Sequence, residues 1–188
     1  NWLRDEAWEL GAETDGQYLQ VRVDKNLRSA LFIYCLTHFW MLSLGEAVFW
    51  DDWAYYGAPA SWVLGDFEET GNFLNLSGFN YVIFSQLGAG FSRFLIFLTG
   101  LASTAIFFLI SEKHLRFTRN EACLLAAIFS ALPFNFARVA YINFNAELCF
   151  FLFLLGWLLI EKYRLLSSLS FFMAFQAQSL LPFFILPY

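Results

Sequence analysis

The chain has few charged residues and correspondingly little polar surface to offer to water. Only 14% of its 188 residues are charged, whereas 59% are hydrophobic and 21% are aromatic. Soluble domains usually carry about a quarter charged residues, so this composition excludes an ordinary soluble globule. With 25 Phe and 7 Trp, the chain has more apolar surface than a globule of this length could bury, and lipid is the solvent that accommodates it.

Basic residues and paired cysteines are also scarce. The net charge of -5 excludes nucleic acid as a partner, because nucleic-acid-binding domains need a basic patch. The three cysteines lie inside apolar runs without CxxC or Cys/His spacing, which argues against a disulfide framework and a zinc site. No cleavable signal peptide is visible in the polar N-terminal residues, so we expect the first apolar segment to be a retained anchor.

Long apolar segments dominate the rest of the chain. A helix needs about 20 mainly apolar residues to cross a hydrocarbon core of roughly 30 Å. The sequence therefore predicts an all-α polytopic membrane protein with about five transmembrane helices, preceded by a cytoplasmic N-terminal segment at residues 1–28. Within the membrane domain, residues 29–188, the predicted spans are 29–50, 94–111, 122–137, 148–160 and 169–188. We expect the last two to pair as a tight hairpin.

The basic residues predict the orientation of these spans. Under this topology, nine of the 11 Lys and Arg residues fall on one face, which the positive-inside rule makes cytoplasmic. Only Arg93 and Arg138 fall on the other face. The sequence thus predicts an integral protein of the plasma or inner membrane, with a cytoplasmic N-terminus and an extracytoplasmic loop at 51–92. The nine are Arg4, Arg22, Lys25, Arg28, Lys113, Arg116, Arg119, Lys162 and Arg164.

The extracytoplasmic loop is acidic and rich in aromatic residues. No Lys or Arg occurs between residues 29 and 91. A loop longer than a simple connection is usually functional or disordered, and the many aromatic residues argue against disorder and for a place at the membrane surface. We expect a short helix at 53–64, broken by Gly57 and Pro59, and an in-plane helix at 79–91 that runs into the second span.

An aspartate pair follows the first predicted span directly. Asp51 and Asp52 are flanked by Trp50 and Trp53, and carboxylates at that depth are costly unless they cap a helix, pair with a charge or catalyse. One carboxylate could accept a proton from an acceptor hydroxyl, or could bind a divalent cation that faces a phosphate. Because adjacent side chains point in different directions, we expect one of the two to cap the next helix. A purely structural role for both is the alternative.

Taken whole, the pattern resembles the C-type membrane glycosyltransferases, which share the GT-C fold. A basic segment and one span are followed by FWDDWAYYG, an aromatic loop, an in-plane helix and a second span that ends in EKHLR. The later segment SALPFNFARVAYINFNAELCFFLFLLGWLLIEKYR looks like the third and fourth spans of bacterial members. The resemblance covers residues 27–188. Members of the family usually have more spans than this, so we expect the chain to be either the N-terminal module of a larger enzyme or a small or partial relative.

The resemblance implies a function and a set of site residues. Such enzymes move a sugar from a polyprenyl-phosphate donor to a lipid, glycan or protein acceptor on the extracytoplasmic face, as in the building of cell-envelope glycans. It implies that Asp51 or Asp52 activates the acceptor hydroxyl or helps to position a metal, and the sequence leaves both the choice and the metal open. The outer-face cations Arg93 and Arg138 are candidates for binding the donor phosphate. Trp53 and Tyr55 are candidates for other substrate contacts, and the carboxylates would be catalytic.

Two other functions remain open. A non-catalytic membrane subunit that scaffolds a partner would explain a short chain with few spans, and further membrane subunits are possible partners beside the bilayer and the lipid-linked donor. A transporter or flippase fragment would need paired charges inside the spans or broken helices in matching positions. The predicted spans hold almost no charge, which disfavours transport.

Overall fold

The computed structural model describes residues 25–69, 76–132 and 139–177, and every regular element in these ranges is a helix. The prediction of an all-α chain is therefore confirmed for the described residues. The predicted N-terminal segment lies outside them except for Lys25–Arg28, which form the first turn of α1. In chain order the elements are α1 (Lys25–His38), η1 (Phe39–Leu44), η2 (Trp50–Ala54), α2 (Ala60–Glu69), α3 (Leu76–Lys113), α4 (Arg119–Ala131), η4 (Tyr141–Asn143), α5 (Phe144–Leu159) and α6 (Arg164–Ala177).

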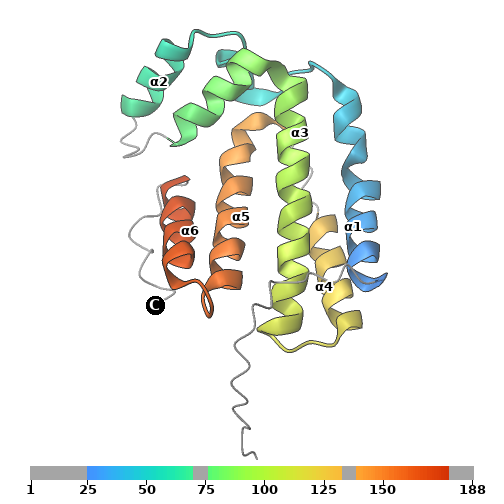
Figure 1. Cartoon of the computed structure of the whole chain (residues 1–188). Helices are drawn as coiled ribbons and strands as arrows, with labels where there is room; N and C mark the ends of the chain where they lie inside the picture. The colour runs from blue at the N-terminus through green and yellow to red at the C-terminus, as the bar shows by residue number, and fades with distance from the viewer. Residues whose placement is uncertain (1–24, 70–75, 133–138, 178–188) are drawn as a thin grey trace, which may run out of the picture.

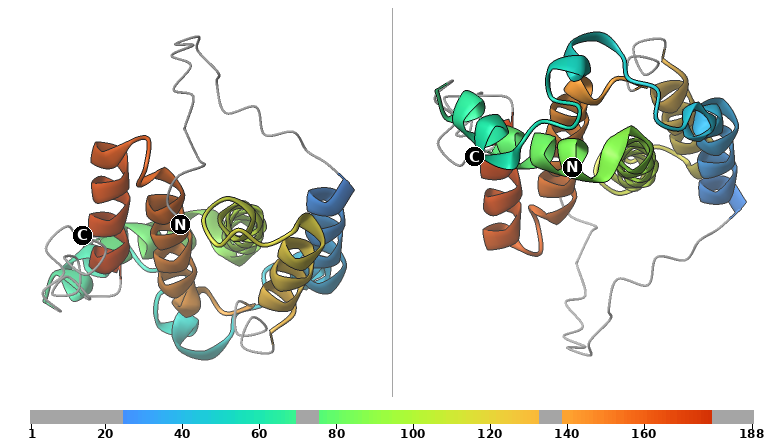
Figure 2. Two further views of the ribbon diagram at one scale, coloured as in Figure 1. Left: turned by 90° about the horizontal axis from the view of Figure 1, so that it is seen from below. Right: turned by 90° about the horizontal axis from the view of Figure 1, so that it is seen from above.

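The five longer helices stand side by side (Figure 1). Seen along their axes, α6, α5 and α3 form a row, and α4 and α1 continue it on the other side of α3 (Figure 2). The central helix α3 contacts each of the other four. The short helices η2 and α2, together with the first part of α3, lie across one end of this row. The acidic loop therefore covers one end of a helical bundle.

Two helical segments are long and apolar enough to cross a membrane, Lys25–Leu44 and Leu76–Lys113. The first starts and ends earlier than the predicted span at 29–50, because η1 continues α1 only to Leu44 and Gly45 then turns the chain with φ 54°. Helix α5 is apolar but shorter. The third and fifth predicted spans extend beyond the described parts of α4 and α6.

Helix α3 contains a sharp bend at Gly88. The backbone there has φ 84° and ψ 169°, a conformation that is essentially restricted to glycine. Before the bend the helix slants across the bundle end, and after it the helix runs down the bundle axis (Figure 1). The prediction of a helix at 79–91 that continues into the second span is confirmed. Its position along a membrane surface stays a prediction.

The predicted helix at 53–64 has different boundaries in the structure. The short 3-10 helix η2 ends at Ala54, Gly57 turns the chain with φ 71°, and α2 begins at Ala60. The break expected at Gly57 and Pro59 is therefore present, and the helix after it continues to Glu69. Because the break separates two elements, α2 is free to pack along the first part of α3.

The bundle interior contains small polar residues beside its apolar core, and many large apolar residues face outward. Buried hydroxyl groups on α3, α4 and α6 donate to backbone carbonyls, so their polarity is satisfied within the bundle. Outward-facing apolar side chains occur on all five long helices, which is the distribution that lipid favours and water does not. They include Phe32, Leu36, Leu98, Leu124, Ile128, Phe150 and Leu169.

Glycines allow two pairs of helices to approach closely. The Tyr34 hydroxyl of α1 lies against Gly100 of α3 and donates to the Phe97 carbonyl at 2.9 Å. Gly156 of α5 lies under the ring of Phe171 of α6. The hydroxyl of Ser167, also on α6, donates to the Gly156 carbonyl at 2.8 Å. Small residues at helix crossings, joined by hydrogen bonds, are typical of membrane bundles, and the expected hairpin of α5 and α6 is present.

Candidate site at the acidic loop

The structure places Asp52 inside the protein. Asp52 lies in η2 and is only 2% exposed. Its Oδ2 accepts the backbone N–H of Tyr141 at 2.5 Å, and its Oδ1 accepts the hydroxyl of Tyr81 at 3.5 Å. Its carbonyl also accepts the backbone N–H groups of Tyr55 and Tyr56, both at 3.1 Å. Hydrogen bonds of Asp52 therefore connect η2 to the segment just before α5 and to α3.

Aromatic rings surround this carboxylate. The ring of Tyr81 contacts Tyr55 at 4.5 Å and Phe67 at 5.0 Å between centroids, and Phe84 stacks on Tyr141 at 5.0 Å. These rings come from the turn after η2, from α2, from α3 and from η4, so the cluster joins the elements at the acidic end. Buried aromatic surface of this size is the main source of packing energy at such a junction.

A second chain of hydrogen bonds continues from Tyr141 toward α5. The Tyr141 hydroxyl donates to the Asn80 carbonyl at 2.8 Å, and the Asn80 side-chain amide donates to Asn145 Oδ1 at 2.7 Å. Burial raises the pKa of Tyr141 above its usual range, and the nearby charge of Asp52 raises it further. The phenol therefore stays protonated and remains a donor across the physiological range.

Glu46 holds the bend of α3. Its carboxylate accepts the backbone N–H of Ala89 at 2.8 Å and that of Gly90 at 3.1 Å. These two N–H groups stand at the start of the second half of α3, where the preceding turn offers them no carbonyl acceptor. The helix dipole also favours a carboxylate at a helix N-terminus. Glycines at 88 and 90 leave room for it, since a Cβ at either position would lie within 3 Å of a Glu46 oxygen.

Arg93 is buried between the two loops at this end. It is 3% exposed, its Nη1 donates to the Gly45 carbonyl, and its Nε donates to the Val139 carbonyl at 3.4 Å. The guanidinium also lies 5.4 Å from the centre of the Phe49 ring. Sequence alone suggested that Arg93 binds a donor phosphate. In the structure its Nε and Nη1 donate to protein carbonyls, so it joins the residues after η1 to the segment before α5.

The other predicted site residues are distributed differently. Trp53 is 65% exposed and meets Tyr56 edge-on at 6.4 Å, so it is available to a substrate or to lipid. Tyr55 is half-buried, and its hydroxyl donates to Asp66 Oδ2 at 2.7 Å. The backbone of Asp51 lies in η2, while its side chain and the whole of Arg138 lie outside the described residues. The structure thus brings Asp52, Tyr55 and Arg93 to one end of the bundle.

Possible metal ligands do not gather at this end. Within residues 25–69, 76–132 and 139–177, no group of three or more His, Cys, Asp or Glu side chains is arranged to hold a metal ion. The carboxylate of Glu46 is engaged with backbone donors and that of Asp52 with a backbone and a phenol donor.

Sequence reasoning missed the partners that shape this site. In the sequence, Glu46, Tyr81 and Tyr141 only contribute to the acidic and aromatic composition, and no motif marks them as site residues. One local signal could have indicated the bend, since the GAG segment at 88–90 interrupts an apolar helical pattern. Nothing in the sequence indicates which acid meets that segment.

Comparisons with known proteins do not identify a family for this chain. No protein-family model matches the chain, and neither the curated proteins nor the solved structures contain a significant match.

Proposed function

We propose that the chain is a GT-C-type membrane glycosyltransferase, or the N-terminal module of one, that moves a sugar from a polyprenyl-phosphate donor to a lipid, glycan or protein acceptor. The reaction would take place on the extracytoplasmic face. The proposal rests on the resemblance carried by FWDDWAYYG and the order of elements around it. Its partners would be the bilayer, the lipid-linked donor and any further membrane subunits.

The observation that carries the proposal is the position of the aspartate pair. Asp51 and Asp52 occupy a 3-10 turn, which follows the first apolar helix after a short connection and lies at the bundle end opposite the start of α1. The segment is anchored by the bonds of Asp52 to Tyr141 and Tyr81. A carboxylate that activates a hydroxyl has to be held in place by a rigid support, and this anchoring supplies one.

Within the pair, we assign the catalytic role to Asp51. Asp52 is buried, and both of its carboxylate oxygens accept protein hydrogen bonds, so it suits the anchoring role. In the reaction, the Asp51 carboxylate would accept the proton of the acceptor hydroxyl as its oxygen attacks the anomeric carbon. The polyprenyl phosphate would leave with the electrons of the broken C–O bond, and direct attack would invert the anomeric centre.

The arrangement of the helices supports a five-span topology with the basic end in the cytoplasm. The start of α1, the α3–α4 connection and the α5–α6 turn lie at the same end of the bundle, away from η2 and α2 (Figure 1). All basic residues of these three segments therefore share one end, as the positive-inside rule requires of a cytoplasmic face. The outward apolar side chains of all five helices agree with a lipid setting.

The test is sugar transfer from radiolabelled polyprenyl-phosphate donors in membranes. Wild type is compared with Asp51→Asn, Asp52→Asn and the control Glu68→Gln, which neutralises an exposed carboxylate of the same loop. Asp51→Asn should abolish the labelled product at an unchanged protein level. Asp52→Asn should lower the amount of folded protein, and Glu68→Gln should change neither quantity. A wild-type rate in Asp51→Asn, at equal expression, would refute the catalytic assignment.

One observation favours the alternative of a non-catalytic scaffold subunit. Both carboxylate oxygens of Asp52 accept hydrogen bonds that join loops and helices. If the pair serves structure alone, wild type gives no product with any donor, and both Asp variants alter only stability. The same transfer assay therefore separates the two functions.

A further inference from the structure

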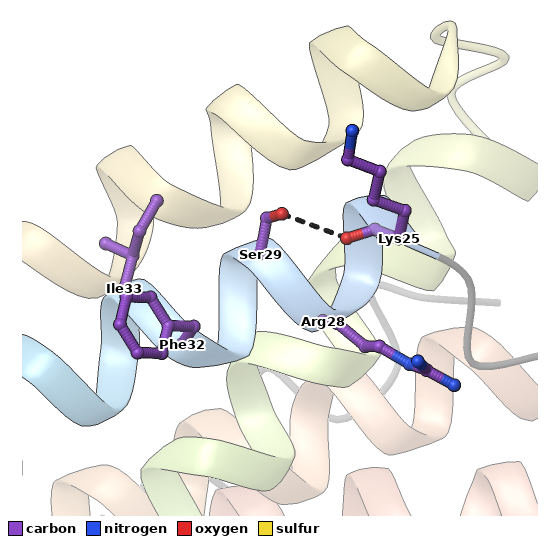
Figure 3. A pocket seen from close by; sticks show the side chains of 5 residues that line it. All are labelled: Lys25, Arg28, Ser29, Phe32 and Ile33. Atoms are coloured by element: carbon purple, nitrogen blue, oxygen red, sulfur yellow. Dashed lines mark hydrogen bonds between the residues drawn. The ribbon is translucent and has the colours of Figure 1, made fainter.

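A hollow lies at the opposite, basic end of the molecule. It has a volume of about 620 Å3, and the described residues that line it all belong to α1, namely Lys25, Arg28, Ser29, Phe32 and Ile33. Figure 3 shows the basic side chains at the start of the helix and the apolar ones further along it. A hollow of this size is within the range of small-molecule sites, and its wall is part cationic and part apolar.

Among the residues that the structure describes, no acidic side chain pairs with the two cations of the hollow. Neither Lys25 nor Arg28 forms an ion pair with any residue in the described ranges. The described acids at this end have other partners: Glu112 pairs with Arg119 at 2.7 Å, Glu121 accepts the Thr118 hydroxyl at 2.8 Å, and Glu161 lies 3.5 Å from His114. The Ser29 hydroxyl donates to its own helix, at the Lys25 carbonyl. Within the described part of the chain, the site therefore offers two unpaired positive charges to an anion.

The apolar wall continues along the same face of α1. Phe32 and Leu36 follow Arg28 at intervals of four residues, each about 6 Å further along the helix, and both are strongly exposed at 66% and 72%. A free phosphate would gain nothing from this stripe. A phospholipid would place its phosphate at the cations and its acyl chain along Phe32 and Leu36, which matches the order of charge and apolar surface.

We propose that this hollow is a binding site for an anionic phospholipid of the cytoplasmic leaflet. The headgroup phosphate would be held by Lys25 and Arg28, and the first part of an acyl chain would lie against Phe32 and Leu36. The inference rests on the proposed membrane orientation and does not depend on sugar transfer. The bound lipid would fix the depth of α1, and with it the height of the acidic loop at the other end of the bundle.

The test is lipid retention by the whole chain in non-ionic detergent micelles, followed by native mass spectrometry. The probes are dioleoyl phosphatidylglycerol, dioleoyl phosphatidylcholine and inorganic phosphate. The double variant Lys25→Gln with Arg28→Gln should bind phosphatidylglycerol about thirtyfold more weakly, since each basic residue near an anionic lipid contributes roughly fivefold. The control is Lys162→Gln with Arg164→Gln, which removes the same charge at the same end but outside the hollow and should bind like wild type.

Several results would overturn the proposal. Equal loss in the control would show diffuse charge attraction, and equal retention of phosphatidylcholine would remove the role of the headgroup charge. Displacement of the lipid by inorganic phosphate at equal concentration would indicate a simple anion site. Because no sugar donor is present, a chain without transferase activity can still pass this test, and an active transferase can fail it.

Discussion

Replacing Gly88 by alanine should destabilise the folded chain by about 2 to 4 kcal/mol, for two separable reasons. The backbone at φ 84° and ψ 169° lies in a region that costs a residue with a Cβ of order 1 to 3 kcal/mol. The new Cβ would also lie 2.6 Å from Glu46 Oε2, so the carboxylate has to leave the backbone N–H groups that it accepts. Loss of a helix N-terminal cap costs about 0.5 to 2 kcal/mol.

A second glycine provides a matched control. Gly57 also has a positive φ, 71°, but a Cβ there would meet nothing within 4 Å. Gly57→Ala therefore carries only the backbone cost of about 1 to 2 kcal/mol. The free energy of unfolding is measured by titrating a denaturing detergent into mild-detergent micelles while tryptophan fluorescence is followed. Gly88→Ala should lower it by at least about 1 kcal/mol more than Gly57→Ala does.

A double-mutant cycle isolates the contact with Glu46. In a chain that already carries Glu46→Ala, the cap is gone, so the cost of Gly88→Ala should fall by about 1 kcal/mol, while that of Gly57→Ala should not change. If Gly88→Ala costs no more than Gly57→Ala, or if its cost is the same with and without Glu46, the proposed role of this carboxylate at the bend is refuted.

Three further predictions concern other parts of the bundle. Asp52→Ala leaves a buried backbone donor unpaired and should cost about 2 to 4 kcal/mol in the same unfolding assay, whereas Asp52→Asn keeps an acceptor and should cost less. Gly100→Ala would drive a Cβ into the Tyr34 hydroxyl and should cost about 1 to 3 kcal/mol, and Tyr34→Phe in the same chain should recover part of this loss. Hydrogen bonds from the side chain and backbone of Thr118 hold the pKa of Glu121 below its usual value. This contact therefore stabilises the fold fully at a pH above the ordinary carboxyl pKa. The stabilisation is lost as the pH falls through the lowered pKa of Glu121. Melting curves recorded between about pH 6 and about pH 3 should show a fall in melting temperature with acid in wild type, and a smaller fall in Thr118→Ala.

The sequence predicted that the chain is helical and that its basic and acidic segments lie at opposite ends of the bundle. Apolar runs with helical spacing predict helices because each turn repeats the same local chemistry, and the structure has helices in all five predicted spans. The separation of basic and acidic residues along the chain already predicted that the start of α1 and the α3–α4 connection lie at one end. Figure 1 shows these segments together.

The end of the first apolar segment was predicted less well. Composition continues the span to Trp50, but the helix ends at Leu44 and the following residues turn back toward α3. Val48 is buried in the cluster that includes Phe84 and Tyr141. An apolar residue that packs against protein is indistinguishable, in sequence alone, from one that faces lipid.

The sequence by itself determined that this chain is helical, apolar and acidic at one loop, because those properties depend on residues close together in the chain. Only the tertiary structure decided what the acids do. Asp52 meets a backbone donor 89 residues away, and Glu46 caps a helix turn 43 residues away. Pairings at such separations are set by how α3 bends over α5 and how the loops close upon it, and local sequence carries no record of that geometry.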